Sequence, residues 1–298
     1  MQSFLRPFHV PIHKMQKICC LGPAGTYTEE ASLKFFGNAS RPVLKRSLDE
    51  VFQSVSSAEA DYAIVAAVNT REGVVTRTYD LLAAHELVIV GEVTLPIRHA
   101  LLSRAHALSD IATVAGHAQA LAQCTEWLSH HLPGRTQLSL SSNAEAARLA
   151  SENPTSAALA SERAAAAYGL NVLRREVQDD PQNATRFYVL ARKDGTHQAT
   201  TAQGAHKTTV LISLPNQSGA LYRALEPFQA GNISLDSLHA RPSRTKRWEY
   251  LFFLEFVNDV NAPQAAIALA KLATFAEVRI LGSYGLPDMG VSSAPPQI

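Results

Sequence analysis

The sequence predicts an α/β protein with two lobes around a cleft, followed by a smaller unit in which the elements run βαββαβ. Three observations lead to this fold class. Apolar runs typical of buried strands alternate with helical patterns in two successive series before residue 193. A polar stretch without periodicity then covers residues 194–206, which predicts a linker. The roughly 80 residues after it contain four more apolar runs and two helical patterns.

The composition predicts a globular protein with real cores. The chain has 298 residues, of which 46% are hydrophobic, and a net charge of +1. Such a balance gives no basic face, so neither nucleic acid nor a membrane is expected as a partner. No run approaches the roughly 20 apolar residues of a membrane span.

The ends of the chain and the cysteines indicate the compartment. Residues 1–15 lack the continuous apolar core of a secretory signal, so we expect a disordered extension there and a disordered tail over 286–298. Three cysteines, two of them in a predicted strand, fit reduced thiols in a cytoplasm. Their spacing does not predict a zinc site.

The first lobe opens with a strand over 17–21 that runs into the loop Gly22–Glu30. Thr26 followed by Glu29 three residues later is a capping box, which predicts a helix beginning in this loop. A helix N-terminus with glycines beside it favours a bound anion, although a tight turn without a ligand has the same pattern.

A polar segment follows the next buried strand of this lobe. Ser47 to Ser57 is predicted as an amphipathic helix, and Tyr62–Val68 is apolar on both faces, as expected of a covered strand. Residues beyond the carboxyl end of such a strand lie where ligands bind in open α/β sheets. Asn69 is therefore a candidate site residue; the alternative is an ordinary turn asparagine.

The second series of elements begins after a long strand over 87–95. A strand at 111–115 leads to a helix whose apolar line is Leu121, Cys124 and Leu128. Gln119 and Gln123 lie four residues apart on another face of that helix, either in solvent or in a binding site. Residues 156–163 are predicted as a strand that leads into a helix.

The segment Asn183–Arg192 is the junction around which the site is expected. Phe187 to Leu190 predicts a buried strand that returns to the first lobe, and a polar loop leads into it. Thr185 can donate a proton, and Arg186 offers a planar cation suited to a carboxylate. The alternative is a threonine on an edge strand beside a solvated arginine.

The C-terminal unit is predicted from its apolar spacing. Strands are expected over 208–214, 233–241, 248–257 and 278–284, one helix around Leu221, Ala224, Leu225 and Phe228, and a second over about 263–274. This is the ferredoxin-like order βαββαβ.

Five motifs in this order resemble those of prephenate dehydratase fused to a C-terminal ACT domain, over residues 18–285. They are the loop Gly22–Thr28, Tyr79–Leu82, Gly91-Glu92, the Thr-Arg-Phe of Asn183–Leu190, and Val189–Arg192. The resemblance implies a two-lobed, periplasmic-binding-protein-like catalytic domain over 16–193, with lobe 1 at about 16–95 and 182–193 and lobe 2 at about 96–181. It also implies an ACT domain over 207–285.

The resemblance implies a reaction and its residues. The family converts prephenate to phenylpyruvate with loss of water and carbon dioxide in L-phenylalanine biosynthesis, and no cofactor or metal is expected. The implied catalytic residues are Thr185, Asn69 and Gln123. The implied substrate-binding residues are Gly25, Thr26, Tyr27, Thr28, Gly116, His117, Arg186 and Phe187.

The ACT resemblance implies regulation by L-phenylalanine and a homodimer or homotetramer. The implied effector-binding residues are Asn216, Gly219, Ala220, Leu221, Arg241 and Pro242. The chain has His239 and Ala240 where the family has Glu and Ser.

Departures from the family pattern leave other functions open. Val68 stands where the family usually has Glu, and Gly116 and Ala118 replace a Ser and a Pro. The alternatives are an arogenate dehydratase, a prephenate decarboxylase, and a catalytically weak homologue that binds metabolites as a regulator.

Overall fold

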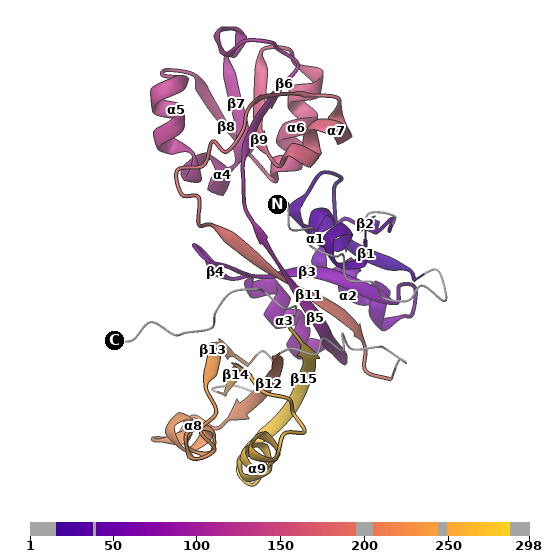
Figure 1. The fold of residues 1–298 in the computed structure, drawn as a ribbon, viewed down its shortest axis with the longest axis vertical. Coiled ribbons are helices and arrows are strands. Elements are labelled where there is room, and N and C mark those ends of the chain that lie inside the picture. The colour runs from indigo at the N-terminus through magenta and orange to yellow at the C-terminus, as the bar shows by residue number, and fades with distance from the viewer. Residues whose placement is uncertain (1–15, 38–39, 195–204, 244–248, 287–298) are drawn as a thin grey trace, which may run out of the picture. The chain divides into compact units, whose positions relative to one another are not determined.

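The computed structural model describes residues 16–37, 40–194, 205–243 and 249–286 (Figure 1). The predicted N-terminal extension, most of the linker and nearly all of the tail lie outside these residues. Contacts divide the chain into two compact units. The first comprises residues up to Tyr79 together with Val93–Tyr188, and the second comprises Asp80–Glu92 together with the residues from Val189 onwards.

The first sheet has the order β2-β1-β3-β11-β5, with the short β4 paired to β3. Strand β1 is parallel to both β2 and β3, as expected of strands joined by helices. The strands are β1 (Ile18–Leu21), β2 (Val43–Lys45), β3 (Tyr62–Asn69), β4 (Gly73–Val74), β5 (Leu87–Pro96) and β11 (Ala184–Arg192). The helices of this series are α1 (Tyr27–Phe36), α2 (Leu48–Ser56) and α3 (Thr76–Ala84).

Both helix starts predicted in this series are confirmed. Thr26 Oγ1 accepts a hydrogen bond from the Glu29 N–H at 3.3 Å, and Ser47 Oγ accepts one from the Glu50 N–H at 3.2 Å. Each helix therefore begins at the residue after its cap, and the start of α1 is fixed next to the end of β1.

The second sheet has the order β10-β6-β9-β7-β8. Its strands are β6 (Ala100–Ser103), β7 (Thr113–His117), β8 (Thr136–Leu140), β9 (Ser156–Ala160) and β10 (Asn171–Arg174). Its helices are α4 (Ala118–Gln123), α5 (Thr125–His131), α6 (Asn143–Glu152) and α7 (Glu162–Tyr168), with a 3₁₀ turn, η1, at Leu108–Asp110.

Alternation along the strands gives this sheet two cores. Leu101 and Leu159 pack with Leu121 and Leu128 on the side of α4 and α5, whereas Ala158 and its neighbours pack with the alanines of α6 and α7. Figure 1 shows the two helix pairs on opposite faces. The single helix predicted along Leu121, Cys124 and Leu128 is wrong, because the helix breaks at Cys124 into α4 and α5; all three side chains are nevertheless buried.

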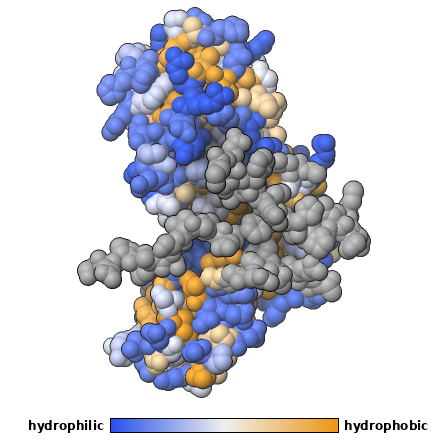
Figure 2. Space-filling view, in the orientation of Figure 1, coloured by the Kyte–Doolittle hydropathy of each residue, from blue (hydrophilic) through white to orange (hydrophobic). Residues whose placement is uncertain are grey.

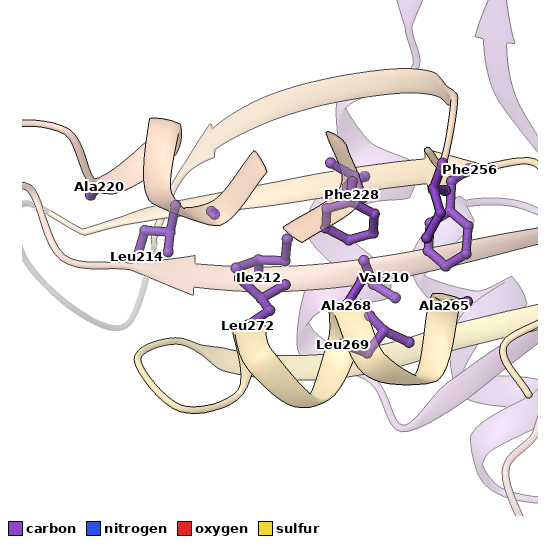
Figure 3. Packing of buried hydrophobic residues seen from close by; sticks show 13 residues of the cluster. Val210, Ile212, Leu214, Ala220, Phe228, Phe256, Ala265, Ala268, Leu269 and Leu272 are labelled. Carbon is purple, nitrogen blue, oxygen red and sulfur yellow. The ribbon is translucent and has the colours of Figure 1, made fainter. Parts of the chain in front are cut away.

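The C-terminal sheet is antiparallel, with the order β13-β14-β12-β15. The elements are β12 (His206–Leu214), α8 (Ala220–Ala230), β13 (Leu235–Pro242), β14 (Tyr250–Phe256), α9 (Pro263–Leu272) and β15 (Glu277–Gly285), so the predicted order βαββαβ is confirmed. Val210, Ile212 and Leu214 alternate along β12 and pack with residues of both α8 and α9 (Figure 3). The two helices therefore cover one face of this sheet.

Two further observations concern the surroundings of the chain. None of the helices in the described residues combines the length and the hydropathy needed to cross a membrane. Cys19, Cys20 and Cys124 are free thiols buried in the protein.

Candidate active site

A cavity of about 220 Å³ lies in the first unit, lined by residues from both of its sheets and by the start of α1. It is lined by Gly25, Thr26, Tyr27, Thr28, Ala66, Asn69, Ile97, His99, Gln119, Ala120, Gln123, Asn143, Ala144, Ser161, Asn183, Thr185 and Phe187. A larger hollow of about 660 Å³ shares Gln119, Gln123 and Asn183 with it. The three residues predicted as catalytic all line the first cavity.

Thr185 and Asn69 form a direct pair within this cavity. Asn69 Nδ2 donates a hydrogen bond to Thr185 Oγ1 at 2.8 Å, and both residues are 8% exposed. The oxygen of Thr185 is thus an acceptor in this bond, and within the described part of the chain the hydroxyl hydrogen has no acceptor of its own. A ligand in the cavity can therefore receive it.

The orientation of the Asn69 amide follows from the backbone. Asn69 Oδ1 accepts hydrogen bonds from the N–H groups of Arg71 at 2.9 Å and Glu72 at 3.2 Å. The NH₂ group must then point the other way, where it reaches Asn183 Oδ1, the Ala184 carbonyl and Thr185. The turn after β3 therefore fixes which atom Asn69 presents to Thr185.

Gln123 joins the same hydrogen-bonded chain. Its Oε1 accepts from Asn183 Nδ2 at 2.9 Å and lies 3.1 Å from His99 Nε2. Its Nε2 lies 3.4 Å from Glu72 Oε1, so a carboxylate borders the larger hollow although Val68 replaces the family's usual Glu. Asn69, Asn183 and Gln123 thus form a continuous line of amides along the cavity.

The start of α1 supplies backbone donors. Gly25, Thr26, Tyr27 and Thr28 all line the cavity, as predicted. The first N–H groups of a helix have no acceptor within the helix, and the positive end of the helix dipole lies among them. Two of the nearby N–H groups already have acceptors. The Glu29 N–H donates to Thr26 Oγ1, and the Gly25 N–H donates to the Glu29 carboxylate at 2.7 Å. The N–H groups of Tyr27 and Thr28 remain for an anionic ligand.

Gly25 allows this loop to approach the second lobe closely. Its φ is +81°, and a Cβ placed there would lie 2.8 Å from Ala164 Cα in α7. Ser161 Oγ donates to the Gly25 carbonyl at 2.9 Å and holds the two segments together. No other residue type fits this position without a shift of α7.

Arg186, expected to hold a substrate carboxylate beside Thr185, does not line either hollow. Side chains alternate along β11, so Thr185 and Phe187 face the cavity while Arg186 faces away from it. Its guanidinium lies 5.6 Å from the centre of the Tyr188 ring. The expected position for Arg186 is therefore wrong.

The glycine and histidine at the end of β7 are also placed differently from expectation. Gly116 is packed against Leu121 and Leu159 and lines neither hollow. His117 lines the larger hollow, and its Nδ1 accepts from the Gln119 N–H as the cap of α4. Of this segment, Gln119 rather than Gly116 reaches the cavity.

Several polar residues of the cavity were not predicted. Asn143 is the first residue of α6, Ser161 is the N-cap of α7, and Asn183 immediately precedes β11. Ser142 and Glu145 have the spacing of a capping box in the sequence, and Ser142 Oγ accepts from the Glu145 N–H, so this signal could have revealed α6 and with it Asn143. His99 follows β5 in a short connection that carries no local signal.

Burial changes the acidity of three groups around the cavity. It lowers the pKa of His99, although the hydrogen bond with Gln123 opposes this change. It raises the pKa of Glu72, and His117 and Gln123 counteract this. It raises the pKa of Tyr27 well above its ordinary range, and Glu30 adds to the rise. The cavity therefore favours neutral forms of the groups it buries.

The described residues contain no group of three or more His, Cys, Asp or Glu side chains placed to hold a metal ion. The absence of a cofactor from the reaction stays a prediction from the resemblance.

The residues predicted to bind an effector lie in the second unit. Gly219, with a φ of +77°, precedes α8, and Ala220 and Leu221 are its first residues, while Asn216 lies in the preceding loop. Arg241 and Pro242 end β13, and the Arg241 guanidinium lies 3.2 Å from the carboxylate of Asp80, which is buried in the same unit.

Comparison with known proteins identifies the family. A family model described as prephenate dehydratase matches residues 18–195. The bifunctional chorismate mutase/prephenate dehydratase of Neisseria gonorrhoeae is 41% identical over 271 residues, which cover 90% of this chain and 74% of that protein.

Two solved structures resemble more than nine tenths of the chain. Prephenate dehydratase from Arthrobacter aurescens in complex with L-Phe is 33% identical with a TM-score of 0.84, and the match covers 94% of this chain and 93% of that one. A protein described as a novel type of quorum-quenching acylase is 27% identical with a TM-score of 0.84, and the match covers 93% and 100% of the two chains. The family match over the residues that build the cavity decides the assignment, and the chain belongs to the prephenate dehydratase family.

Proposed function

We propose that this chain converts prephenate to phenylpyruvate. The ring carboxylate leaves as CO₂, and its bonding electrons enter the ring. The ring hydroxyl leaves at the same time and takes one proton, which makes water. The dianion and one proton thus give the phenylpyruvate anion, CO₂ and water. The enzyme's task is to supply the proton and to hold the substrate in position.

Thr185 supplies the proton in this proposal, and the alkoxide that remains takes up a proton from solvent before the next turnover. A hydroxyl is a weak acid, so its oxygen needs stabilisation as negative charge develops on it. The hydrogen bond from Asn69 Nδ2 at 2.8 Å provides that stabilisation and leaves the hydroxyl hydrogen for the substrate. This pair is the observation that carries the proposed function.

Backbone amides bind the substrate carboxylates. The lining of the smaller cavity contains no Lys or Arg side chain among the described residues, so the N–H groups at the start of α1 are its fixed positive end. Tyr27 and Thr28 offer these donors, while Asn69 and Gln123 orient the ring end. Phe187, 1% exposed, packs behind Thr185 and restricts its direction.

Residues 207–285 act as an ACT domain that binds L-phenylalanine and lowers the activity of the catalytic domain over 16–193. The related enzyme that is solved with L-Phe supports this effector. The helix start at Gly219–Leu221 offers backbone donors for its carboxylate. Arg241 contacts Asp80 through one nitrogen and its Nε has no hydrogen-bond partner among the described residues, so an effector carboxylate can bind the same guanidinium beside Asp80.

Side-by-side pairing of two ACT domains is proposed as the basis of a homodimer or homotetramer. Figure 2 shows apolar atoms at the surface of the C-terminal unit, and its exposed apolar side chains include Leu238, Ile267 and Ile280. A stable dimer in light scattering that dissociates on Leu238→Asp would support this assembly. A monomer at all concentrations would contradict it.

The test of the proposed reaction compares three forms of the protein. The native chain is incubated with prephenate, and phenylpyruvate is followed by its absorbance in base. The kcat of Thr185→Ala is expected to fall at least about a hundredfold. Thr185→Ser keeps the hydroxyl, so its kcat is expected to lie close to the native value. A native chain without product, or full activity in Thr185→Ala, would overturn the proposal.

The same assay separates the alternatives. Rates on prephenate and on arogenate, measured with one preparation, decide which substrate is preferred. Ligand binding without turnover would favour a regulatory homologue, and a non-aromatic product would favour a decarboxylase. Adding L-phenylalanine to the prephenate assay shows whether the effector inhibits.

A further inference from the structure

His99 occupies a fixed place between α1 and α4. Its backbone N–H donates to Gln178 Oε1 at 2.9 Å, and its carbonyl accepts from the Val177 N–H at 2.9 Å. Its ring lies with Nδ1 3.1 Å from the Tyr27 hydroxyl and Nε2 3.1 Å from Gln123 Oε1. The residue is 3% exposed, so its ring nitrogens must find their partners within the protein.

The line of amides decides which atom of Gln123 faces His99. The two backbone N–H groups after β3 fix Asn69, whose NH₂ then points at Asn183 Oδ1 at 3.0 Å. Asn183 must present its own NH₂ to Gln123, at 2.9 Å from Oε1. The carbonyl oxygen of Gln123 is therefore the atom that lies against His99 Nε2, and its NH₂ group lies on the side of Glu72.

This order sets the position of the hydrogen on the imidazole ring. Two acceptors cannot bond to each other, so Nε2 must carry a hydrogen that it donates to Gln123 Oε1. Since burial favours the neutral ring, Nδ1 is then an acceptor for the hydroxyl of Tyr27. The Tyr27 oxygen also lies 2.7 Å from the Arg98 carbonyl, so its single hydrogen is divided between two acceptors.

We propose that His99 is a positioning residue for the dehydratase reaction, and that its Nε2–H group holds the Gln123 carboxamide with the oxygen against His99 and Asn183. This inference rests on the proposed function. With its oxygen held by two donors, Gln123 presents its NH₂ group on the side of Glu72 in the larger hollow, where one of its two hydrogens remains for a ligand. A substrate oxygen there meets a donor of fixed direction.

Other charged groups surround His99 and contribute to its titration. Tyr27 faces it from α1, and Glu72 lies behind Gln123. His99 also lines a hollow of about 260 Å³, which is bordered by the charged residues Glu30, Arg98, Glu162, Arg163 and Glu176. A change in pH therefore alters several of these groups together with His99, so the native chain and the variants are compared at one pH.

Two substitutions separate the roles of the ring nitrogens. In His99→Gln the side-chain NH₂ can stand where Nε2 stands and donate to Gln123. In His99→Asn the shorter amide reaches only the place of Nδ1, toward Tyr27. His99→Gln is expected to keep kcat within a few-fold of the native value, whereas His99→Asn loses up to about a hundredfold. His106→Asn, at an exposed histidine outside the cavity lining, is the matched control and leaves kcat unchanged.

A double-mutant cycle and a spectrum complete the test. Gln123→Ala combined with His99→Asn is expected to be no slower than Gln123→Ala alone, because the positioned group is already gone. Nitrogen-15 NMR of the native chain, assigned by the signal missing in His99→Gln, is expected to show Nε2 protonated and Nδ1 bare.

Equal losses in the two His99 variants, additive losses in the cycle, or a hydrogen on Nδ1 would each overturn the inference. The spectrum is recorded on the native chain without substrate, and the only variant it needs is His99→Gln, for the assignment. A native chain that makes no phenylpyruvate yet has the Nε2–H form would instead count against the proposed function.

Discussion

Asn69 and Thr185 lie 116 residues apart in the sequence, yet Asn69 Nδ2 donates to Thr185 Oγ1 at 2.8 Å. The pair joins the end of β3 to the start of β11, two neighbouring strands of one sheet. The amide oxygen of Asn69 accepts from backbone N–H groups, whereas its amide nitrogen donates to Thr185. A substitution can therefore remove the donor and keep the acceptor.

The first prediction concerns the nitrogen of Asn69. In Asn69→Asp the carboxylate can still accept from the Arg71 and Glu72 N–H groups, so the turn is expected to fold. The donor to Thr185 is lost and a negative charge faces the hydroxyl oxygen. We expect kcat to fall about 10²- to 10³-fold, as for loss of one donor to developing negative charge. Steady-state kinetics on prephenate measure this.

Asn171→Asp is the control for this substitution. Asn171 Nδ2 donates to backbone carbonyls near β6, and the residue does not line the cavity. Its kcat should match that of the native chain. If Asn69→Asp turned over prephenate at the native rate, the donor role of Asn69 would have to be given up.

The second prediction compares two glycines with positive φ. Gly134 has a φ of +72°, and a Cβ there would meet no described atom within 4 Å, whereas a Cβ at Gly25 would meet the backbone of Ala164. Gly134→Ala is expected to cost about 1–2 kcal/mol of unfolding free energy through backbone strain alone. Gly25→Ala adds overpacking of about 1–3 kcal/mol. Urea unfolding of both variants measures the difference between their unfolding free energies. Equal losses would mean that α7 moves away from the added Cβ at no cost.

The sequence predicts the site where local signals are strong. The capping box at Thr26 places α1 correctly, the polar residue after the buried strand over 62–68 identifies Asn69, and the polar loop that leads into the next buried strand identifies Thr185. The two residues meet because the end of β3 lies beside the start of β11 in one sheet.

The remaining site residues depend on tertiary structure. Arg186 follows Thr185 in sequence, but alternation along β11 turns it away, and only the sheet shows which face is the cavity. The strands β8 and β10 and the helix α6 are short or alanine-rich, so their periodicity is weak. His99 gains its role from Tyr27 and Gln123, which approach it from distant parts of the chain.

The third prediction follows from the burial of His99, which keeps its pKa in the folded chain below the ordinary 6.5. Below pH 6.5 the unfolded chain binds a proton at this residue that the folded chain resists, so the unfolding free energy falls as the pH falls. Above that pH the residue contributes no slope. The loss is at most about 1.4 kcal/mol for each pH unit between the two pKa values.

Comparison with His99→Gln isolates this contribution, since all other groups titrate in both proteins. The difference in unfolding free energy, native minus variant, is expected to decrease from pH 7.5 to 5. Urea unfolding at each pH measures it. A constant difference over this range would show that burial does not change the titration of His99.

The last prediction concerns the buried charges of the second unit. Lys207 Nζ lies 3.1 Å from Glu92 and 2.9 Å from Asp236, and the side chains of Lys207 and Glu92 are only 6% and 10% exposed. Tyr284 donates a hydrogen bond to the same Glu92 at 2.8 Å. Lys207→Met keeps the stem but removes the positive charge beside the buried carboxylate of Glu92, which is expected to cost about 3–5 kcal/mol of unfolding free energy.

Lys271→Met is the matched control, because Lys271 and its partner Glu226 are 53% and 40% exposed. Water solvates that carboxylate when the lysine is removed, so the expected cost is about 0–1 kcal/mol. Adding Glu92→Gln to Lys207→Met should recover much of the lost stability, since the buried negative charge is then removed as well. A loss in Lys207→Met that Glu92→Gln does not relieve would point to packing of the lysine stem, rather than charge pairing, as the source of the stability.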